Sequence, residues 1–462
     1  MSSGDTMLKP VEYTTATAGG LAAALAARRV SAVELCDAAI AAIEAKDGPI
    51  NAVVVRDFER ARDAARAADA ALAKGERRPL LGVPMTVKEA HDVAGLPTTW
   101  GVEQFRNWIA RTDSVGVARL KAAGAVILGK TNVPPLLSDW QSVNPIYGRT
   151  NNPFDLSRSP GGSSGGSAAA LAAGFVPLEL GSDIGGSIRI PSAFCGTFGH
   201  KPSYDLVPQR GHSFPGSDGV GMPLNVVGPM ARTASDLALA LDVLAGPSDE
   251  EAAGYRVDLP VPRHARLADH RVLILDRHPL APVDSEILNA IESLAGRLAA
   301  AGALVARESE LLPDLDAAHR TYLRMLMTVM SRGAVQQRNP PITAHQWMGM
   351  QDDQLKVRRE WGVLFKTFDV VLSPTVGVVA FPHFDEPVWG ERKLIIDGRA
   401  EPFPNQLAWP GMAIFAHLPA TAFPIGRTRA GLPIGAQAIG PYLEDRTTIA
   451  FAELVAREWG AS

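Results

Sequence analysis

Apolar residues recur along the chain in two alternating patterns, short continuous runs and longer stretches with helical spacing. Residues 51–55, 125–129 and 271–276 are short runs rich in Val, Ile and Leu, which predicts buried strands. Residues 17–46 are rich in alanine and predict two helices, and the charged, alanine-rich residues 57–74 predict another. This alternation favours an α/β protein in which helices cover a parallel or mixed sheet.

The same alternation continues through the second half of the chain. Ser31 and Glu34 form a capping-box pattern at the start of one early helix. The segment 80–90 predicts a turn followed by a strand that carries Lys88. Further helices are predicted at 114–123, at 233–246, at 283–302, within 314–366 and after Asp445.

Two stretches interrupt the pattern. Residues 203–225 contain several Gly, Pro and His residues and predict a long surface loop. Residues 250–262 resemble a linker that could divide two domains, but strands are predicted on both sides of it. We therefore expect a single domain over residues 1–462.

Composition narrows the class of protein. The 462 residues carry 45 Lys+Arg and 49 Asp+Glu, a formal charge of -4, without the long basic run typical of nucleic-acid binding. No apolar run reaches the roughly 18 residues that a membrane span needs. The first residues also lack the basic start and apolar run of a signal peptide. The expectation is a cytoplasmic enzyme with neither a nucleic-acid nor a membrane partner.

Two glycine-rich segments match the residue patterns of known binding or catalytic motifs but lack the structural context that each motif requires. Residues 124–131, GAVILGKT, fit the P-loop pattern, but their four middle residues form the predicted strand, so no flexible loop presents N–H groups to a phosphate. Residues 161–165 fit the GxSxG nucleophile elbow, with Asp183 and His200 as nominal partners. That elbow requires a buried strand before it, whereas the preceding NNPFDLSRSP contains two prolines.

The serine and glycine residues form two turns rather than one linker. A linker would join elements through solvent, but the run 161–166 leads directly into an alanine-rich helix. A strand then leads into a second turn at 181–187. We expect the two turns to converge at a functional site.

The stretch that contains both turns resembles a known family. Residues 159–202, SPGGSSGGSAAALAAGFVPLELGSDIGGSIRIPSAFCGTFGHKP, resemble the signature of the amidase signature family. The segments GVPMTVKEAHDVAG, VVGPMARTASDLALALDVLAG, DVVLSPT and GLPIGAQAIG have counterparts at similar positions. The resemblance covers nearly the whole chain and is strongest in a core at about 80–245. It implies a central twisted mixed sheet with helices on both faces, and a variable substrate-pocket region at about 310–410.

The resemblance also implies a Ser–Ser–Lys catalytic triad. By position, Ser187 aligns with the nucleophile and Ser163 with the bridging serine, whose peptide bond is cis in the family. Lys88 aligns with the lysine that starts the proton relay. The oxyanion hole falls on the backbone N–H groups of Ile184, Gly185, Gly186 and Ser187.

These residue types suit the chemistry. A serine hydroxyl becomes a good nucleophile only when a base takes its proton, and a lysine can act as that base only when it is neutral. Lys88 should therefore lie in a dry pocket, where burial favours the neutral amine. Ser163 can both donate and accept a hydrogen bond, so it can pass a proton between Ser187 and Lys88.

Other candidate residues are assigned structural roles. Asp183 and Arg189 flank the second turn and should fix it through charge-assisted hydrogen bonds, with Ser164 in a supporting role. Cys195 is expected in the core, and His91, although near Lys88 in sequence, is also assigned a structural role. The ten histidines show no paired-ligand spacing, so we expect no metal and no cofactor.

The substrate is less well determined. A methionine-rich segment suggests either helix packing or a dimer interface, or a flexible apolar wall or lid over a hydrophobic acyl or aryl group. Pro135 and the sequence HKPSYDLVPQRGHSFPG differ from the pattern usual in the glutaminyl-tRNA amidotransferase A-type subunits of the family. The methionine-rich segment named above contains Met325, Met327, Met330, Met348 and Met350, with Tyr322 and Trp347 nearby.

The sequence thus predicts an amidohydrolase of linear small amides, with hydrophobic or aryl substrates and with ester or carbamate (urethane) cleavage as an extension. The alternative is an A-type amidotransferase subunit that releases ammonia from glutamine within a complex. A homodimer is left open.

Overall fold

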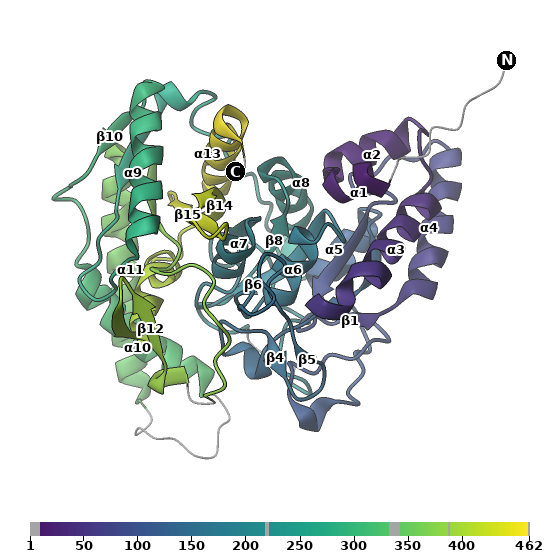
Figure 1. Ribbon diagram of the computed structural model, residues 1–462, viewed down its shortest axis with the longest axis horizontal. Coiled ribbons are helices and arrows are strands. Elements are labelled where there is room, and N and C mark those ends of the chain that lie inside the picture. The colour runs from purple at the N-terminus through teal and green to yellow at the C-terminus, as the bar shows by residue number, and fades with distance from the viewer. Residues whose placement is uncertain (1–9, 218–220, 332–341, 387–388, 461–462) are drawn as a thin grey trace.

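The computed structural model describes residues 10–217, 221–331, 342–386 and 389–460. In these residues, eleven strands form one sheet that runs through the whole molecule (Figure 1). From one edge to the other, the strands are β1 (Val53–Arg56), β3 (Val126–Thr131), β2 (Pro84–Lys88), β6 (Leu178–Asp183), β8 (Val226–Ala231), β7 (Phe198–Lys201), β14 (Ala420–Arg427), β15 (Pro433–Ile439), β11 (Val370–Pro374), β9 (Arg271–Ile274) and β10 (Leu304–Ala306).

The sheet is mixed, as the sequence predicts. The strands β3, β2 and β6 are parallel to one another, as are β11, β9 and β10. The strands between these two groups pair antiparallel, and so does the edge strand β1 with β3. Two short hairpins lie outside the sheet, β4 (Val143–Asn144) with β5 (Gly148–Arg149) and β12 (Lys393–Ile396) with β13 (Arg399–Pro402).

Helices pack against the sheet and also lie at both ends of the molecule (Figure 1). The helices are α1 (Pro10–Thr15), α2 (Ala18–Ala26), α3 (Ala32–Ile50), α4 (Phe58–Ala73), α5 (Val115–Ala122), α6 (Gly165–Ala172), α7 (Arg189–Cys195), α8 (Ala234–Leu244), α9 (Ser285–Ala300), α10 (Leu315–Met330), α11 (Ala344–Thr367), α12 (Ala408–Phe415) and α13 (Asp445–Trp459). Short 3₁₀ helices lie at Glu103–Phe105, Pro135–Leu137, Glu251–Ala253, Leu267–Asp269, Trp389–Glu391 and Phe403–Leu407.

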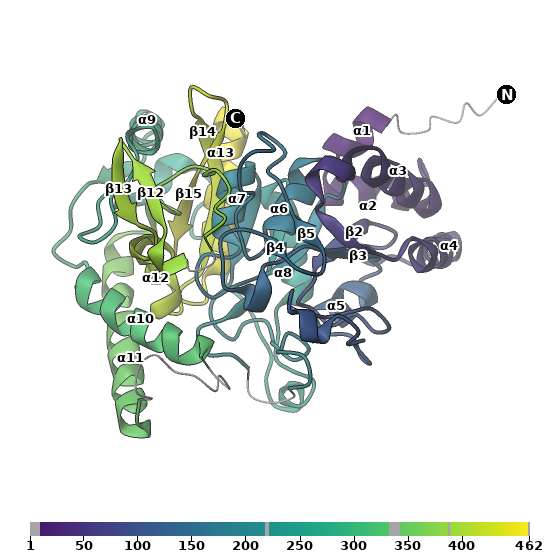
Figure 2. The ribbon, with the colours of Figure 1, turned by 60° about the horizontal axis from the view of Figure 1, so that its bottom comes forward.

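The central strands are covered by two pairs of helices. The helices α6 and α7 contact each other and the middle strands, and α8 and α13 form a second contacting pair. Figure 1 places α1–α4 at one end of the molecule and α9–α11 at the other. Figure 2 shows α10 and α11 at the same end of the molecule as the β12–β13 hairpin. None of the helices in the described ranges is long and apolar enough to cross a membrane.

Most predicted elements are present, and the Ser31–Glu34 capping box forms as the sequence predicts. The strands before and after the linker-like residues 250–262 belong to the same sheet. A single domain over residues 1–462 remains our prediction. Residues 332–341, part of the region predicted to be mainly helical, lie outside the described residues. Residues 1–9 also lie outside them.

The prediction of a surface loop at 203–225 is only partly right: the described residues, 203–217 and 221–225, form neither helix nor strand, but several of them are buried. Leu206, His212 and Asn225 are each only 3% exposed. Two polar side chains of this segment pair with each other: the Gln209 side chain donates to the Asn225 carbonyl at 3.0 Å, and the Asn225 amide donates to Gln209 Oε1 at 2.8 Å. A loop rich in Gly, Pro and polar residues can be buried when its polar atoms are paired in this way.

Candidate active site

Two parallel strands deliver the lysine to one edge of the sheet. In β2 and β6, Val87 lies beside Leu180, so the ends of the two strands meet. Lys88, the last residue of β2, donates from Nζ to Ser163 Oγ at 2.6 Å and to Ser182 Oγ at 2.9 Å. Ser182 was not among the predicted site residues. Its place at the end of the strand next to β2 was the available signal.

Ser163 reaches Lys88 from the first glycine turn, just before α6. The peptide bond between Gly162 and Ser163 is cis, as the family resemblance implies. A Cβ at Gly162 would lie 2.4 Å from the carbonyl oxygen of Asp139, so only glycine fits there. The turn therefore lies tightly against the 139–141 segment, and this contact fixes the position of Ser163.

The environment of Lys88 favours the neutral amine. Its side chain is fully buried, and this burial lowers its pKa to about 7, although Asp183 and Glu179 oppose the shift. Burial also raises the pKa of Glu179 to about 8, so its carboxyl is largely protonated at neutral pH. Lys88 thus meets the requirement derived from the sequence, a lysine in a dry pocket.

Ser187 lies at the end of the second glycine turn and is 4% exposed. Gly186 before it has a φ of +92°, and a Cβ there would meet Ile190 at 2.6 Å, so the turn requires glycine at this position. The Ser164 N–H donates to the Ser187 carbonyl at 3.2 Å, which ties the two turns together. The two turns therefore converge, as the sequence predicts.

Ser163 and Ser187 both line one small cavity. In the part of the chain that the structure describes, no hydrogen bond joins the two hydroxyls directly. Catalytic hydrogen bonds often tighten only when substrate is bound. The arrangement thus brings the three predicted triad residues into one site, with the contact between Lys88 and Ser163 already formed.

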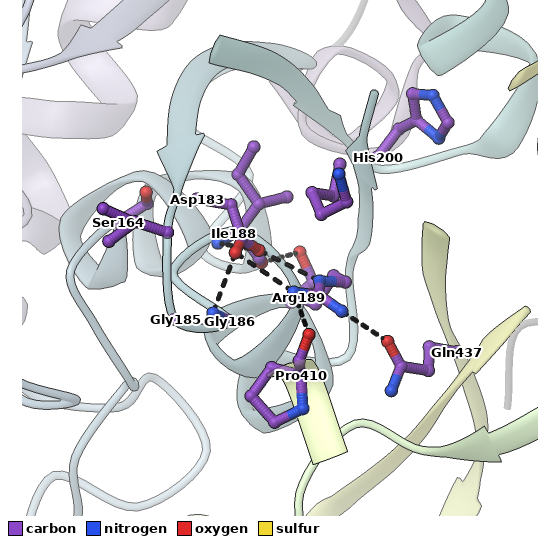
Figure 3. A network of polar contacts seen from close by, with 12 residues as sticks. Ser164, Asp183, Gly185, Gly186, Ile188, Arg189, His200, Pro410 and Gln437 are labelled. Atoms are coloured by element: carbon purple, nitrogen blue, oxygen red, sulfur yellow. Dashed lines mark hydrogen bonds and ion pairs between the residues drawn. The ribbon is translucent and has the colours of Figure 1, made fainter. Parts of the chain in front are cut away.

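A buried ion pair fixes the second turn (Figure 3). Arg189 donates to both carboxylate oxygens of Asp183, at 3.0 and 3.1 Å, and also to Gln437 and to the Pro410 carbonyl. Burial alone would raise the pKa of Asp183, but the Arg189 guanidinium and two backbone N–H groups hold it below its usual value. The Asp183 carboxylate is thus ionised and holds the turn from inside, in keeping with its predicted structural role.

One of the four predicted oxyanion-hole donors already has an acceptor within the protein. The Gly186 N–H donates to Asp183 Oδ1 at 2.8 Å, so this group is already engaged. Among the described residues, nothing accepts from the N–H groups of Ile184, Gly185 and Ser187. We therefore remove Gly186 from the four predicted donors, because its N–H already donates a hydrogen bond to the Asp183 carboxylate.

Two aromatic side chains orient this segment from the opposite side. Tyr322, on α10, donates from its hydroxyl to the Ile184 carbonyl at 3.0 Å. Trp140 donates from Nε1 to the Gly185 carbonyl at 2.9 Å. Because these contacts hold the two carbonyls, the orientation of the intervening peptide planes is fixed. Sequence reasoning did not assign either contact, since both join distant parts of the chain.

An apolar cavity of about 120 Å³ opens beside Ser187. Met327 and Met330 line it, whereas Met325 and Met350 are buried in the surrounding core and Met348 is exposed. The methionine-rich segment therefore contributes both to packing in the core and to the lining of this cavity. The other lining residues are Leu137, Ser138, Asp139, Trp140, Ile184, Gly185, Ser187, Leu326, Trp389, Phe403 and Leu407.

Three candidate residues outside the triad, Lys130, Cys195 and His91, are buried. Lys130, the lysine of the P-loop-like segment, is buried on β3 and donates to Thr98 Oγ1 at 2.8 Å and to the Pro97 carbonyl. Cys195 is buried, and burial raises the pKa of its thiol. His91 contacts the Gly181 carbonyl at 3.3 Å. The described residues contain no cluster of His, Cys, Asp and Glu that could hold a metal ion.

Comparisons with known proteins give a family match and relatives that cover nearly the whole chain. The sequence model of the Amidase family matches residues 34–344 and 329–449. The chain is 34% identical to the A-type subunit of a glutamyl-tRNA(Gln) amidotransferase from Roseiflexus sp. (strain RS-1), with 94% of each chain covered. It is 32% identical to fatty-acid amide hydrolase 2-A of Danio rerio, covering 95% of this chain and 88% of that protein.

A solved structure gives the same result. A bacterial aryl acylamidase of the amidase signature family superposes with a TM-score of 0.80 at 26% identity, with 96% of each chain covered. The family match, the full-length relatives and this shared mixed-sheet fold together show that the chain belongs to the amidase signature family of hydrolases, which act on C–N bonds.

Proposed function

We propose that this chain is a stand-alone amidohydrolase that cleaves the C–N bond of a small amide through Lys88, Ser163 and Ser187. The observation that carries the proposal is the buried Lys88 amine, held 2.6 Å from Ser163 Oγ at the cavity that Ser163 shares with Ser187. A lysine that is fully buried and has its pKa near neutrality can act as a base.

The reaction proceeds in two steps. Ser187 Oγ attacks the carbonyl carbon while its proton passes to Ser163 and the Ser163 proton passes to neutral Lys88. The N–H groups of Ile184, Gly185 and Ser187 stabilise the oxyanion that forms. The C–N bond then breaks, and the proton returns through Ser163 to the departing nitrogen. Water repeats the sequence on the acyl-enzyme, which releases the acid and restores Ser187.

The apolar cavity suits a hydrophobic acyl or aryl group. Its one charged lining residue among those described is Asp139, and Arg392 donates to both of its carboxylate oxygens at 2.8 Å. A charged acyl group would find no free partner on this wall. Amides of hydrophobic or aromatic acids are the proposed substrates, with esters and carbamates as further ones.

A second candidate function is the release of ammonia from glutamine within an amidotransferase complex. The full-length similarity to an A-type amidotransferase subunit supports it. Glutamine, however, carries an ammonium and a carboxylate, and both need charged partners when they leave water. The apolar lining of the cavity therefore favours the stand-alone hydrolase.

The experiment that separates these functions is a substrate panel on the purified chain. Aliphatic amides, nitroanilides, aryl esters, aryl carbamates and glutamine would be tested, with Ser187→Ala as control. We expect turnover of apolar amides by the chain alone, and loss of that turnover in the variant. Ammonia release from glutamine that appears only when a partner protein is added would instead establish the second function.

The pH dependence of kcat/KM should follow Lys88. Burial lowers its pKa to about 7, and only the neutral amine accepts a proton, so the rate should rise with pH through about 7 and then level off. Lys201 is also buried and has a pKa lowered to about 7. Lys201→Met is therefore the control: the midpoint of the profile should stay near 7 in this variant. A profile that falls as pH rises through 7 would contradict Lys88 as the base.

A further inference from the structure

A second, smaller cavity adjoins Ser187 on the side of Ser163. It is lined by both serines and by Trp100, His212, Met222 and Asn225, among others. The larger apolar cavity shares Leu137, Ile184, Ser187 and Met330 with it but does not include Ser163. The nucleophile thus borders two adjoining cavities that differ in size.

The proton relay decides which part of the substrate enters which compartment. The departing nitrogen must receive its proton from Ser163, so it must lie within hydrogen-bond distance of that hydroxyl. Only the smaller cavity is bordered by Ser163 as well as Ser187. The acyl group then extends the other way, past Gly185 into the apolar cavity.

The size of the smaller cavity limits what can leave. Its volume is about 10 Å³, the space that the centre of one water molecule needs. The apolar cavity is about 120 Å³. Ammonia or water fits the smaller compartment, whereas an aromatic amine would have to displace the side chains around it.

His212 lines this compartment with a side chain whose polar atoms have no hydrogen-bond partner among the described residues. Its side chain is buried, and neither ring nitrogen has a hydrogen-bond partner among the described residues. The ring packs against His91 and Trp100, with centroids 4.6 and 5.3 Å apart. Burial and the nearby Lys88 lower its pKa to about 3, so the ring is neutral, with one donor and one acceptor nitrogen. An unpaired buried imidazole is costly unless a ligand completes its hydrogen bonds.

We propose that the cavity lined by Ser163, His212 and Met222 is the binding site for the departing ammonia and the incoming water, with His212 as their hydrogen-bond partner. The inference rests on the proposed function and deepens it: the substrates are primary amides of hydrophobic acids. His212 contacts the small nucleophile or leaving group and orients it, while the proton transfers remain with Ser163 and Lys88.

Acyl transfer to small amines tests the site. In the presence of hexanamide, the nitrogen of hydroxylamine attacks the acyl-enzyme, its C–N bond replaces the bond to Ser187 Oγ, and its proton returns to Ser187 through Ser163. The product is the hydroxamic acid. O-benzylhydroxylamine carries the same attacking nitrogen with a bulky substituent, and we expect it to react at least about a hundredfold more slowly than hydroxylamine.

Two variants probe the wall and the polar group. Met222→Ala should reduce the preference for hydroxylamine at least tenfold because it enlarges the cavity, whereas Met327→Ala, in the apolar cavity alone, should leave the preference unchanged. His212→Phe should lower kcat/KM for hexanamide roughly tenfold, the usual effect of one lost hydrogen bond. His212→Asn, which keeps a donor and an acceptor, should restore it to within about threefold.

The outcomes separate this inference from the function on which it rests. If the wild-type chain transfers the acyl group equally well to both amines, the small compartment is not the nucleophile site. The same holds if His212→Phe hydrolyses hexanamide at the wild-type rate. If the wild-type chain forms no hydroxamate, or if Ser187→Ala still forms it, the acyl-enzyme on Ser187 is wrong and both proposals fail.

Discussion

Replacing Ser187 with alanine should abolish amide turnover, with a loss of about 10⁴-fold or more in kcat, because it removes the hydroxyl that we propose forms the acyl-enzyme. The fold should be unaffected. The described contacts of Ser187 are made by its backbone carbonyl, which accepts from the Ser164 N–H, and alanine keeps that group. We expect the thermal unfolding midpoint of the variant to equal that of the wild-type protein.

The matched control is Ser192→Ala, on α7. Ser192 is also a buried serine, and its Oγ donates to the Ile188 carbonyl at 2.8 Å, away from both cavities. This variant should keep most of the activity. Mass spectrometry of the trapped acyl-enzyme should place the adduct on Ser187. An adduct on Ser163 would instead support the GxSxG elbow, which the sequence also fits at 161–165.

The candidate triad could be predicted from the sequence, because the order of its motifs along the chain can be recognised without knowledge of the fold. Lys88, Ser163 and Ser187 each lie in a segment that resembles a family counterpart. The contact of Lys88 with Ser182 was not accessible, because it follows from the parallel register of β2 and β6. A role that depends on which strands are neighbours cannot be obtained from spacing along the chain.

Long-range contacts explain most of the other omissions. Tyr322 holds the Ile184 carbonyl across 138 positions of the sequence, and no local pattern predicts such a pair. His212 was placed in a surface loop because polar and glycine-rich segments usually face solvent. Its burial depends on pairing between side chains of the same loop and on packing against Trp100.

The β12–β13 hairpin and the helix α12, two of the features absent from the prediction, were missed for different reasons. The β12–β13 hairpin turns at Asp397 and Gly398, both with positive φ, and an Asp-Gly pair is a recognised hairpin signal that was overlooked. The helix α12 is buried on all sides, so its sequence has no amphipathic period to detect. The first omission could have been avoided from the sequence, and the second could not.

Removing the Lys88 amine should lower kcat/KM for amides by several orders of magnitude at neutral pH, because the relay acts as a unit. Lys88→Met preserves the length and apolar stem of the side chain while removing the base. Stability should not decrease greatly, since a lysine buried with its pKa lowered to about 7 already costs free energy through desolvation. We expect kcat/KM to fall while the unfolding midpoint stays close to the wild-type value.

Lys88→Arg distinguishes a base from a fixed positive charge. A guanidinium retains a charge and hydrogen-bond donors toward Ser163 and Ser182 but stays protonated at every pH at which the protein is folded. If Lys88 acts as the neutral base, this variant should be as inactive as Lys88→Met and should gain no activity as the pH is raised. Near-normal activity in either variant at neutral pH would mean that the proton of Ser187 leaves by another route, and the relay through Ser163 would have to be abandoned.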